Sequence, residues 1–226
     1  MQIYRLFSPG LRFCHWVWVT CIVVLFATGL YIGNPMYIGT QGIEPAVAIG
    51  KWFSMETIRR VHFFAGFILC SCLLLRFYLL FTAKGDRLFP RFWKPEYRKG
   101  LLEVLAYYAM LRRHHRPYLR NPLAGTAYVG ALVLMAVEAV TGLAMYSMIR
   151  PNSLLAQIFG PVNRWLGNEF ATHVVHHVIA WVLILFAMIH VYLVFFTDVK
   201  EKNGELSSMV SGRKFFEETP VDLKDL

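Results

Sequence analysis

Charge is scarce in this sequence, and its scarcity excludes a soluble globular domain. Only 16% of the 226 residues are charged, 57% are apolar, and the mean hydropathy is +0.46. This composition is typical of a polytopic membrane protein. Four apolar runs, of about 13–33, 57–82, 124–147 and 171–197, are long enough to cross a bilayer as helices. We therefore expect an all-α fold, a four-helix membrane bundle that forms a single integral membrane domain over residues 1–226.

The cysteine positions do not indicate a disulfide framework, and the first apolar run does not resemble a cleaved signal peptide. The four cysteines, Cys14, Cys21, Cys70 and Cys72, lie inside predicted membrane helices, so we expect small buried thiols and no disulfide framework. The first run is too long for the hydrophobic segment of a signal peptide, and no clear small-residue cleavage site follows it. We expect it to remain as a membrane helix.

Positive charge is nearly absent from two of the connecting segments and abundant in the others. The loop 83–123 holds ten Lys and Arg residues against three acidic residues, and the tail 198–226 holds five basic residues. The segments 34–60 and 148–170 hold three and two. Because basic residues gather on the cytoplasmic side of a membrane, both termini, the loop 83–123 and the tail are predicted to be cytoplasmic.

The basic loop lacks a nucleic-acid-binding motif, so its charge is explained by membrane topology and no nucleic-acid partner is expected. Residues of about 97–113 combine Leu101, Leu102 and Leu105 with basic residues on the same segment. This pattern predicts an amphipathic helix that lies at the inner membrane interface, in contact with lipid. A plain surface helix without lipid contact is the alternative.

Histidine stands out in the apolar runs, where acidic residues are absent apart from Glu138. His176 and His190 lie 14 residues apart in one run, which corresponds to about 21 Å of helical rise on nearly the same side of the helix. One imidazole is thus predicted near each membrane face. Matching by depth pairs His62 with His176 near the outer face and His15 with His190 near the inner face.

Each histidine pair has the geometry to clamp one haem iron between two imidazole nitrogens. Such bis-histidine ligation leaves no open iron position, which favours electron transfer over oxygen chemistry. The sequence has no Cys-x-x-Cys-His arrangement, so covalent haem attachment is not indicated. A packing or hydrogen-bonding role is the alternative for any single histidine, but it explains four histidines at two matched depths poorly.

Arg76 supports this interpretation, two glycines are compatible with it, and Glu138 is separate from it. Arg76 lies 14 residues after His62 at the inner level, where a haem propionate would offset the cost of its charge; the alternative is a side chain that snorkels to the headgroups. Gly29 and Gly142 would let a flat macrocycle approach a helix, or would simply allow close helix packing. For Glu138 we favour a neutral, hydrogen-bonded structural role.

The residues around the histidines resemble a known family. Arg12-Phe13-Cys14-His15-Trp16-Val17, followed by Leu25-Phe26-Ala27-Thr28-Gly29, is similar to the first signature of the cytochrome b subunits of membrane-bound nickel–iron hydrogenases. The stretch 173–178, followed by Trp181, Phe186 and His190, is similar to the second signature. Val174 stands where that pattern has a small Ser, Thr or Ala, a departure that touches no ligand.

The resemblance implies two haem b groups with His15, His62, His176 and His190 as axial ligands, in a bacterial cytoplasmic (inner) membrane. It implies a membrane anchor for the small and large subunits of a periplasmic nickel–iron hydrogenase. Electrons would pass from the small subunit to the outer haem, then to the inner haem, and finally to a quinone, either menaquinone or ubiquinone. By similarity to the gamma subunits of formate dehydrogenases, Asn121 is implied in a quinone pocket near the inner level.

Three alternatives remain at this point. The same bundle could serve a formate dehydrogenase or a thiosulfate reductase. It could act alone as a superoxide oxidase with quinone as acceptor, although the long tail and outer loops argue against this. A metal-ion transporter would also use intramembrane histidines, but such transporters are typically richer in intramembrane carboxylates than a chain with Glu138 alone.

Overall fold

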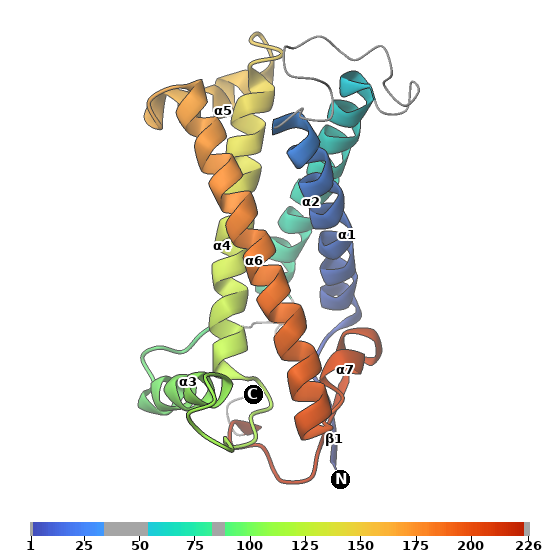
Figure 1. Cartoon of the computed structure of the whole chain (residues 1–226), viewed down its shortest axis with the longest axis vertical. Helices are drawn as coiled ribbons and strands as arrows, with labels where there is room; N and C mark the ends of the chain where they lie inside the picture. The colour runs from blue at the N-terminus through green and yellow to red at the C-terminus, as the bar shows by residue number, and fades with distance from the viewer. Residues whose placement is uncertain (1, 34–53, 83–88, 224–226) are drawn as a thin grey trace. The chain divides into compact units, whose positions relative to one another are not determined.

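Four long helices dominate the computed structural model, which describes residues 2–33, 54–82 and 89–223. They are α1 (Pro9–Gly33), α2 (Met55–Thr82), α4 (Pro122–Ser147) and α6 (Glu169–Glu201), and each is long and apolar enough to cross a membrane (Figure 1). Few of their side chains are buried, as expected for helices whose apolar surface faces lipid. The predicted fold class is confirmed, and the chain is a multi-pass membrane protein.

The helices extend beyond the apolar runs that predicted them. Each begins two to four residues earlier than expected, and α6 ends at Glu201 rather than at residue 197. Pro9 and Pro122 open α1 and α4, where a missing N–H costs nothing. Hydropathy marks only the part of a helix that lies in hydrocarbon, whereas backbone hydrogen bonds continue into the headgroup region.

The chain forms two compact units, each assembled from several segments. Unit 1 comprises Met1–Arg12, Tyr78–Glu138 and His177–Leu226, and unit 2 comprises Phe13–Phe77 and Ala139–His176. The border between the units falls inside α1, α2, α4 and α6, so each of these helices contributes to both. The single domain expected over residues 1–226 stays a prediction.

Unit 2 contains a helix that the sequence analysis treated as part of a loop. This helix, α5 (Leu154–Trp165), runs across the ends of α4 and α6 (Figure 1). The Ser153 hydroxyl caps it by accepting from Ala156 N at 3.2 Å. The Asn163 side chain is buried and donates from Nδ2 to the carbonyl oxygen of Ala144 on α4 at 3.0 Å. The segment 148–170 therefore contains a helix that is hydrogen-bonded to α4.

Aromatic and thiol groups make several of the contacts between the helices of unit 2. The rings of Phe63 and Phe67 on α2 pack edge-on against Tyr146 of α4, with centroids 4.9 and 5.3 Å apart. Cys72 on α2 points its sulfur at the carbonyl oxygen of Cys14 on α1, 3.8 Å away. All four cysteines are free thiols, and Cys14, Cys21 and Cys72 are buried, as the sequence predicts.

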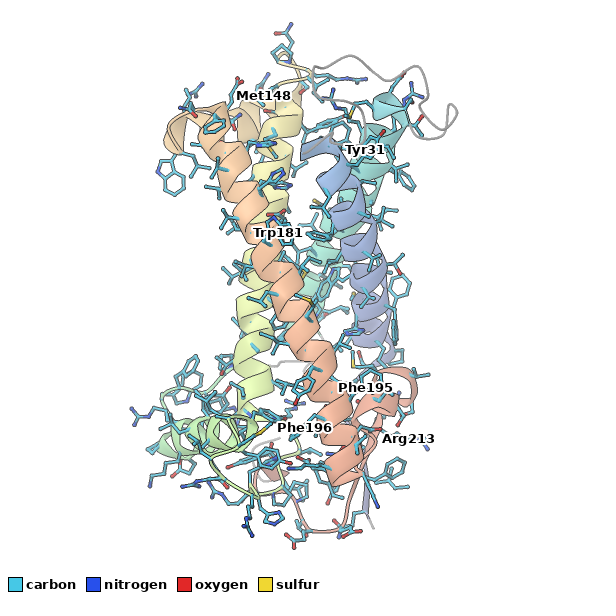
Figure 2. All side chains as sticks on the ribbon, viewed as in Figure 1. Tyr31, Met148, Trp181, Phe195, Phe196 and Arg213 are labelled. Atoms are coloured by element: carbon cyan, nitrogen blue, oxygen red, sulfur yellow. The ribbon has the colours of Figure 1, made fainter. Side chains whose placement is uncertain are left out.

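Unit 1 contains the predicted amphipathic helix as α3 (Pro95–Tyr108). Its Val104 and Tyr107 are buried, while Leu102 and Leu105 are exposed. Phe196 of α6, which Figure 2 labels, packs against two tyrosine rings. Its ring centroid lies 6.0 Å from that of Tyr107 and 6.3 Å from that of Tyr108. The helix is shorter than the predicted 97–113, because the chain turns at Met110 with a positive φ of 60°. Its lipid contact stays a prediction.

The two ends of the chain pair with each other in unit 1, in what we call the terminal clasp. It consists of β1 (Gln2–Arg5), β2 (Arg213–Phe216) and α7 (Glu205–Ser211). The strands are antiparallel, with Gln2 opposite Phe216, and Figure 2 labels Arg213 at the start of β2. The clasp is closed by Leu6 N, which donates to the carbonyl oxygen of Gly212 at 2.9 Å. This pairing of the two chain ends is not predicted from the sequence.

Candidate functional site

His62 is held in a defined orientation by a threonine on the neighbouring helix. Its Nδ1 lies 2.8 Å from Oγ1 of Thr28, which projects from α1 in the same unit. The Thr28 hydroxyl also lies 2.7 Å from the carbonyl oxygen of Val24, one turn earlier. A hydroxyl has one hydrogen, which is donated to the carbonyl oxygen, so Thr28 accepts from Nδ1–H of His62. In that tautomer Nε2 carries the lone pair that binds a metal.

His176 is held in the same way by a different pair of helices. Its Nδ1 lies 3.0 Å from Oγ1 of Thr141, which projects from α4 toward α6 in unit 2. Thr141 is 2% exposed and Thr28 is 8% exposed, so both contacts lie away from water. Both histidines therefore lie in unit 2, and a threonine hydroxyl of a neighbouring helix contacts Nδ1 of each ring.

A glycine follows each of these threonines and makes room for the imidazole. A Cβ atom on Gly29 would lie 3.5 Å from Cε1 of His62, and one on Gly142 would lie 3.2 Å from Cε1 of His176. From the sequence, these glycines are expected to leave space for a macrocycle or for helix packing. The structure shows that the space is taken by the two histidine rings.

We call each arrangement a Thr-Gly clamp: Thr28 and Gly29 against His62, and Thr141 and Gly142 against His176. Sequence reasoning did not single out either threonine. A signal was available, because the tripeptide Thr-Gly-Leu occurs in the first apolar run and again in the third. Threonine in a membrane helix usually hydrogen-bonds the backbone of its own helix, so the repeat alone did not indicate a contact with histidine.

The inner-pair histidines lie in different units. His15, in unit 2, is half-buried, and its ring meets Trp16 edge-on with centroids 5.2 Å apart. His190, in unit 1, is exposed and stacks on Phe186 with centroids 5.9 Å apart. Their pairing stays a prediction from the sequence.

Arg76 is fully buried in unit 2, with 0% of its surface exposed. A side chain that snorkels toward lipid headgroups would be partly exposed, so the structure disfavours that alternative. Its contact with a propionate stays a prediction.

Asn121 caps α4 in unit 1. Its Oδ1 accepts from the backbone N–H of Leu123 at 2.9 Å, and its Nδ2 donates to the Tyr108 hydroxyl at 3.2 Å. Burial, together with the charges of Glu201 and Glu205, raises the pKa of Tyr108 to about 12 against the opposing effect of its hydrogen bonds, so this phenol stays neutral. The structure thus gives Asn121 a helix-capping role, and its part in a quinone pocket stays a prediction.

The donor set of the outer pair suits a haem better than a bare metal ion. A porphyrin supplies four ligands in its plane, so two imidazoles complete the iron coordination. Across residues 2–33, 54–82 and 89–223, no group of three or more His, Cys, Asp or Glu side chains could hold a metal ion. The buried Nδ1 contacts match the hydrogen-bonded imidazoles expected of metal ligands.

Comparison with known proteins assigns the family. Residues 6–212 match the family described as prokaryotic cytochrome b561. The chain belongs to this family. It is 34% identical over 220 residues to the "Probable Ni/Fe-hydrogenase B-type cytochrome subunit" of Bradyrhizobium diazoefficiens, covering 93% of this chain and 85% of the relative.

Two further relatives of this cytochrome b561 chain carry similar names. The protein of that name in Azotobacter vinelandii is 32% identical, covering 96% of this chain and 90% of the relative. The "Probable Ni/Fe-hydrogenase 1 B-type cytochrome subunit" of Escherichia coli is 28% identical, covering 92% and 89%. The resemblance stated from the two sequence signatures is confirmed, and membership of a b-type cytochrome family implies haem b as the cofactor.

Proposed function

We propose that this chain is the di-haem cytochrome b anchor of a periplasmic nickel–iron hydrogenase and passes electrons from its small subunit to quinone. The names of the relatives supply the hydrogenase partner. The observation that carries the electron-transfer role is the matched pair of Thr-Gly clamps, which orient His62 and His176 within one unit.

Haem b, when bound, supplies reversible one-electron chemistry. His62 and His176 hold the outer haem, and their Nε2 atoms are the ligating nitrogens. His15 and His190 hold the second haem, an assignment that rests on the sequence and on the family resemblance. Arg76 supplies a buried positive charge for a propionate.

The proposed sidedness follows from the distribution of basic residues. Both termini lie in the cytoplasm, and the small and large hydrogenase subunits lie on the periplasmic side of the inner membrane. Menaquinone or ubiquinone is reduced near the inner face, where the Asn121 region contributes to its pocket. Electrons then cross the membrane during turnover, so reconstituted complex should generate a membrane potential when it oxidises hydrogen.

The ligand assignment is tested by a pyridine haemochrome assay on the purified complex. We expect two haem b groups per chain in the wild type and one in each of His62→Ala and His190→Ala. His114→Ala, which changes an exposed histidine in unit 1, is the matched control and should keep both haems. A colourless wild type, or unchanged haem content in both ligand variants, rejects the proposal.

The identity of the partner needs a separate measurement. Affinity purification of the full chain from solubilised membranes should recover nickel and iron–sulfur subunits in fixed proportion. Recovery of a molybdenum- or tungsten-containing formate dehydrogenase instead would overturn the hydrogenase assignment while leaving the haem assignment intact.

A further inference from the structure

We propose that Thr28 and Thr141 are positioning residues that fix which nitrogen of His62 and His176 ligates the outer haem and that lower its reduction potential. This inference rests on the proposed function and deepens it. It concerns two residues that touch neither iron nor substrate and act through the two histidines.

The repetition of the clamp is the first argument. Two different helix pairs, α1 with α2 and α4 with α6, place a threonine hydroxyl on Nδ1 of a histidine, at 2.8 Å and 3.0 Å. In both cases the next residue is a glycine that lies against Cε1 of the same ring. One such contact is a common helix–helix hydrogen bond, but a matched pair on the two ligands of one site indicates a shared requirement.

The direction of the hydrogen bond is the second argument. The Thr28 hydroxyl hydrogen points to the Val24 carbonyl oxygen at 2.7 Å, or is shared with that of Leu25 at 3.2 Å. The oxygen can therefore offer only a lone pair to the imidazole, and His62 must be the donor. A histidine that donates from Nδ1 ligates through Nε2, so the threonine selects the tautomer before any cofactor binds.

The burial of both hydroxyls is the third argument. Thr28 and Thr141 are 8% and 2% exposed, and a hydrogen bond is electrostatically stronger in such surroundings than in water. Donation from Nδ1 pushes electron density toward Nε2 and makes the imidazole a more basic ligand. A more basic ligand stabilises ferric over ferrous iron, so the two threonines together should shift the potential in the negative direction.

The test compares valine, which keeps the shape of threonine but removes its hydroxyl, with serine, which keeps the hydroxyl. Thr28→Val and Thr141→Val are made in the full complex, with Thr28→Ser and Thr141→Ser beside them. Thr20→Val is the control, because Thr20 lies on the same helix and bonds the Trp16 carbonyl oxygen at 3.0 Å in an exposed position. The readout is a redox titration followed by visible absorption and by electron paramagnetic resonance.

We expect each valine variant to raise the potential of one haem, seen as a several-fold larger ferrous fraction at a fixed ambient potential. The affected haem should be the one that His62→Ala removes, and its ferric resonance should shift. The serine variants and Thr20→Val should match the wild type. If a valine variant loses that haem while its serine counterpart retains it, the positioning role is likewise supported.

An unchanged potential in both valine variants, or an equal change in Thr20→Val, overturns the inference. Failure of the proposed function looks different, because the wild type would then contain no haem or His62→Ala would remove none. A haem-replete wild type with unmoved potentials in the valine variants therefore rejects only the role of the two threonines.

Discussion

Gly142 on α4 lies directly against the ring of His176 on α6, with only 3.2 Å between Cε1 and the place where an alanine Cβ would be. That separation is shorter than an ordinary van der Waals contact, so the histidine has to move if a side chain is added. At Gly29 the corresponding distance to His62 is 3.5 Å, which is an ordinary contact. The two clamps thus differ in how tightly the glycine packs.

Gly142→Ala should therefore harm the site more than Gly29→Ala does. Overpacking at Gly142 costs about 1–3 kcal/mol. Alanine in a helix gains about 1 kcal/mol over glycine, and no overpacking opposes this gain at Gly29, so Gly29→Ala should be neutral to slightly stabilising. The haem-to-protein ratio and the thermal unfolding of each variant measure this difference. Gly130→Ala is the control. Gly130 lies on the same helix as Gly142, and its added Cβ would enter open space. Equal haem loss in Gly29→Ala and Gly142→Ala would contradict the geometry.

The terminal clasp should depend on Gly212. This residue has a φ of +78°, and an added Cβ would lie 2.8 Å from the backbone oxygen of Phe7. A left-handed conformation costs about 1–2 kcal/mol for an alanine, and the backbone clash adds to it. Gly212→Ala should release both chain ends, seen as faster limited proteolysis of residues 2–7 and 205–216. Gly160→Ala, in open space on α5, should be cleaved like the wild type.

The membrane helices and the histidines could be predicted from the sequence because each produces a strong local signal. Apolar runs longer than 20 residues have few explanations, and a histidine such as His176 inside one is rare enough to mark a site. Depth along a helix follows from counting residues, so the sequence assigns His62 and His176 to one level. Unit 2 contains both of them, together with His15, and their pairing stays a prediction.

Other features could not be predicted, because their cause lies in contacts between distant segments. Thr28 and Thr20 both bond their own helix backbone, and the contact with His62 that sets Thr28 apart depends on the position of α2. Strands β1 and β2 come from opposite ends of the chain, and neither would be stable alone. The end of α3 depends on the backbone at Met110, which no residue preference indicates.

Asn163 should hold α5 against α4 with a modest contribution to stability. Its Nδ2 donates to the Ala144 carbonyl oxygen, which also accepts from the Ser147 hydroxyl at 2.7 Å. Asn163→Ala therefore leaves that oxygen partly satisfied and should cost about 1 kcal/mol. Asn163→Asp buries a negative charge beside the same carbonyl oxygen and should cost several times more. Thermal unfolding distinguishes the alanine variant from the aspartate variant, and Gln157→Ala, at an exposed position, is the control. An aspartate variant as stable as the alanine variant would refute this account.

The contact between His115 and Glu201 should make stability pH-dependent in one direction. Burial alone would lower the pKa of His115. The hydrogen bond to Glu201 at 2.9 Å, a second to the Arg116 carbonyl oxygen, and the charges of Glu201 and Glu103 outweigh that effect and raise it above its ordinary 6.5. A raised pKa means that the folded state binds the proton more tightly than the unfolded state does.

The stability that this pair contributes is then fully present below about pH 6.5 and is lost as the pH rises through the folded pKa. Glu201→Gln should lower the melting temperature of the protein by about 2–4 °C at low pH, the shift expected for a loss of about 1 kcal/mol. At high pH, where His115 is neutral in both proteins, the difference should shrink. Glu217→Gln, in the exposed part of the tail, should change neither value. The attraction between Glu201 and His115 requires a charged histidine, so the drop in melting temperature should disappear at high pH. An equal drop at both pH values would show that Glu201 acts by packing instead.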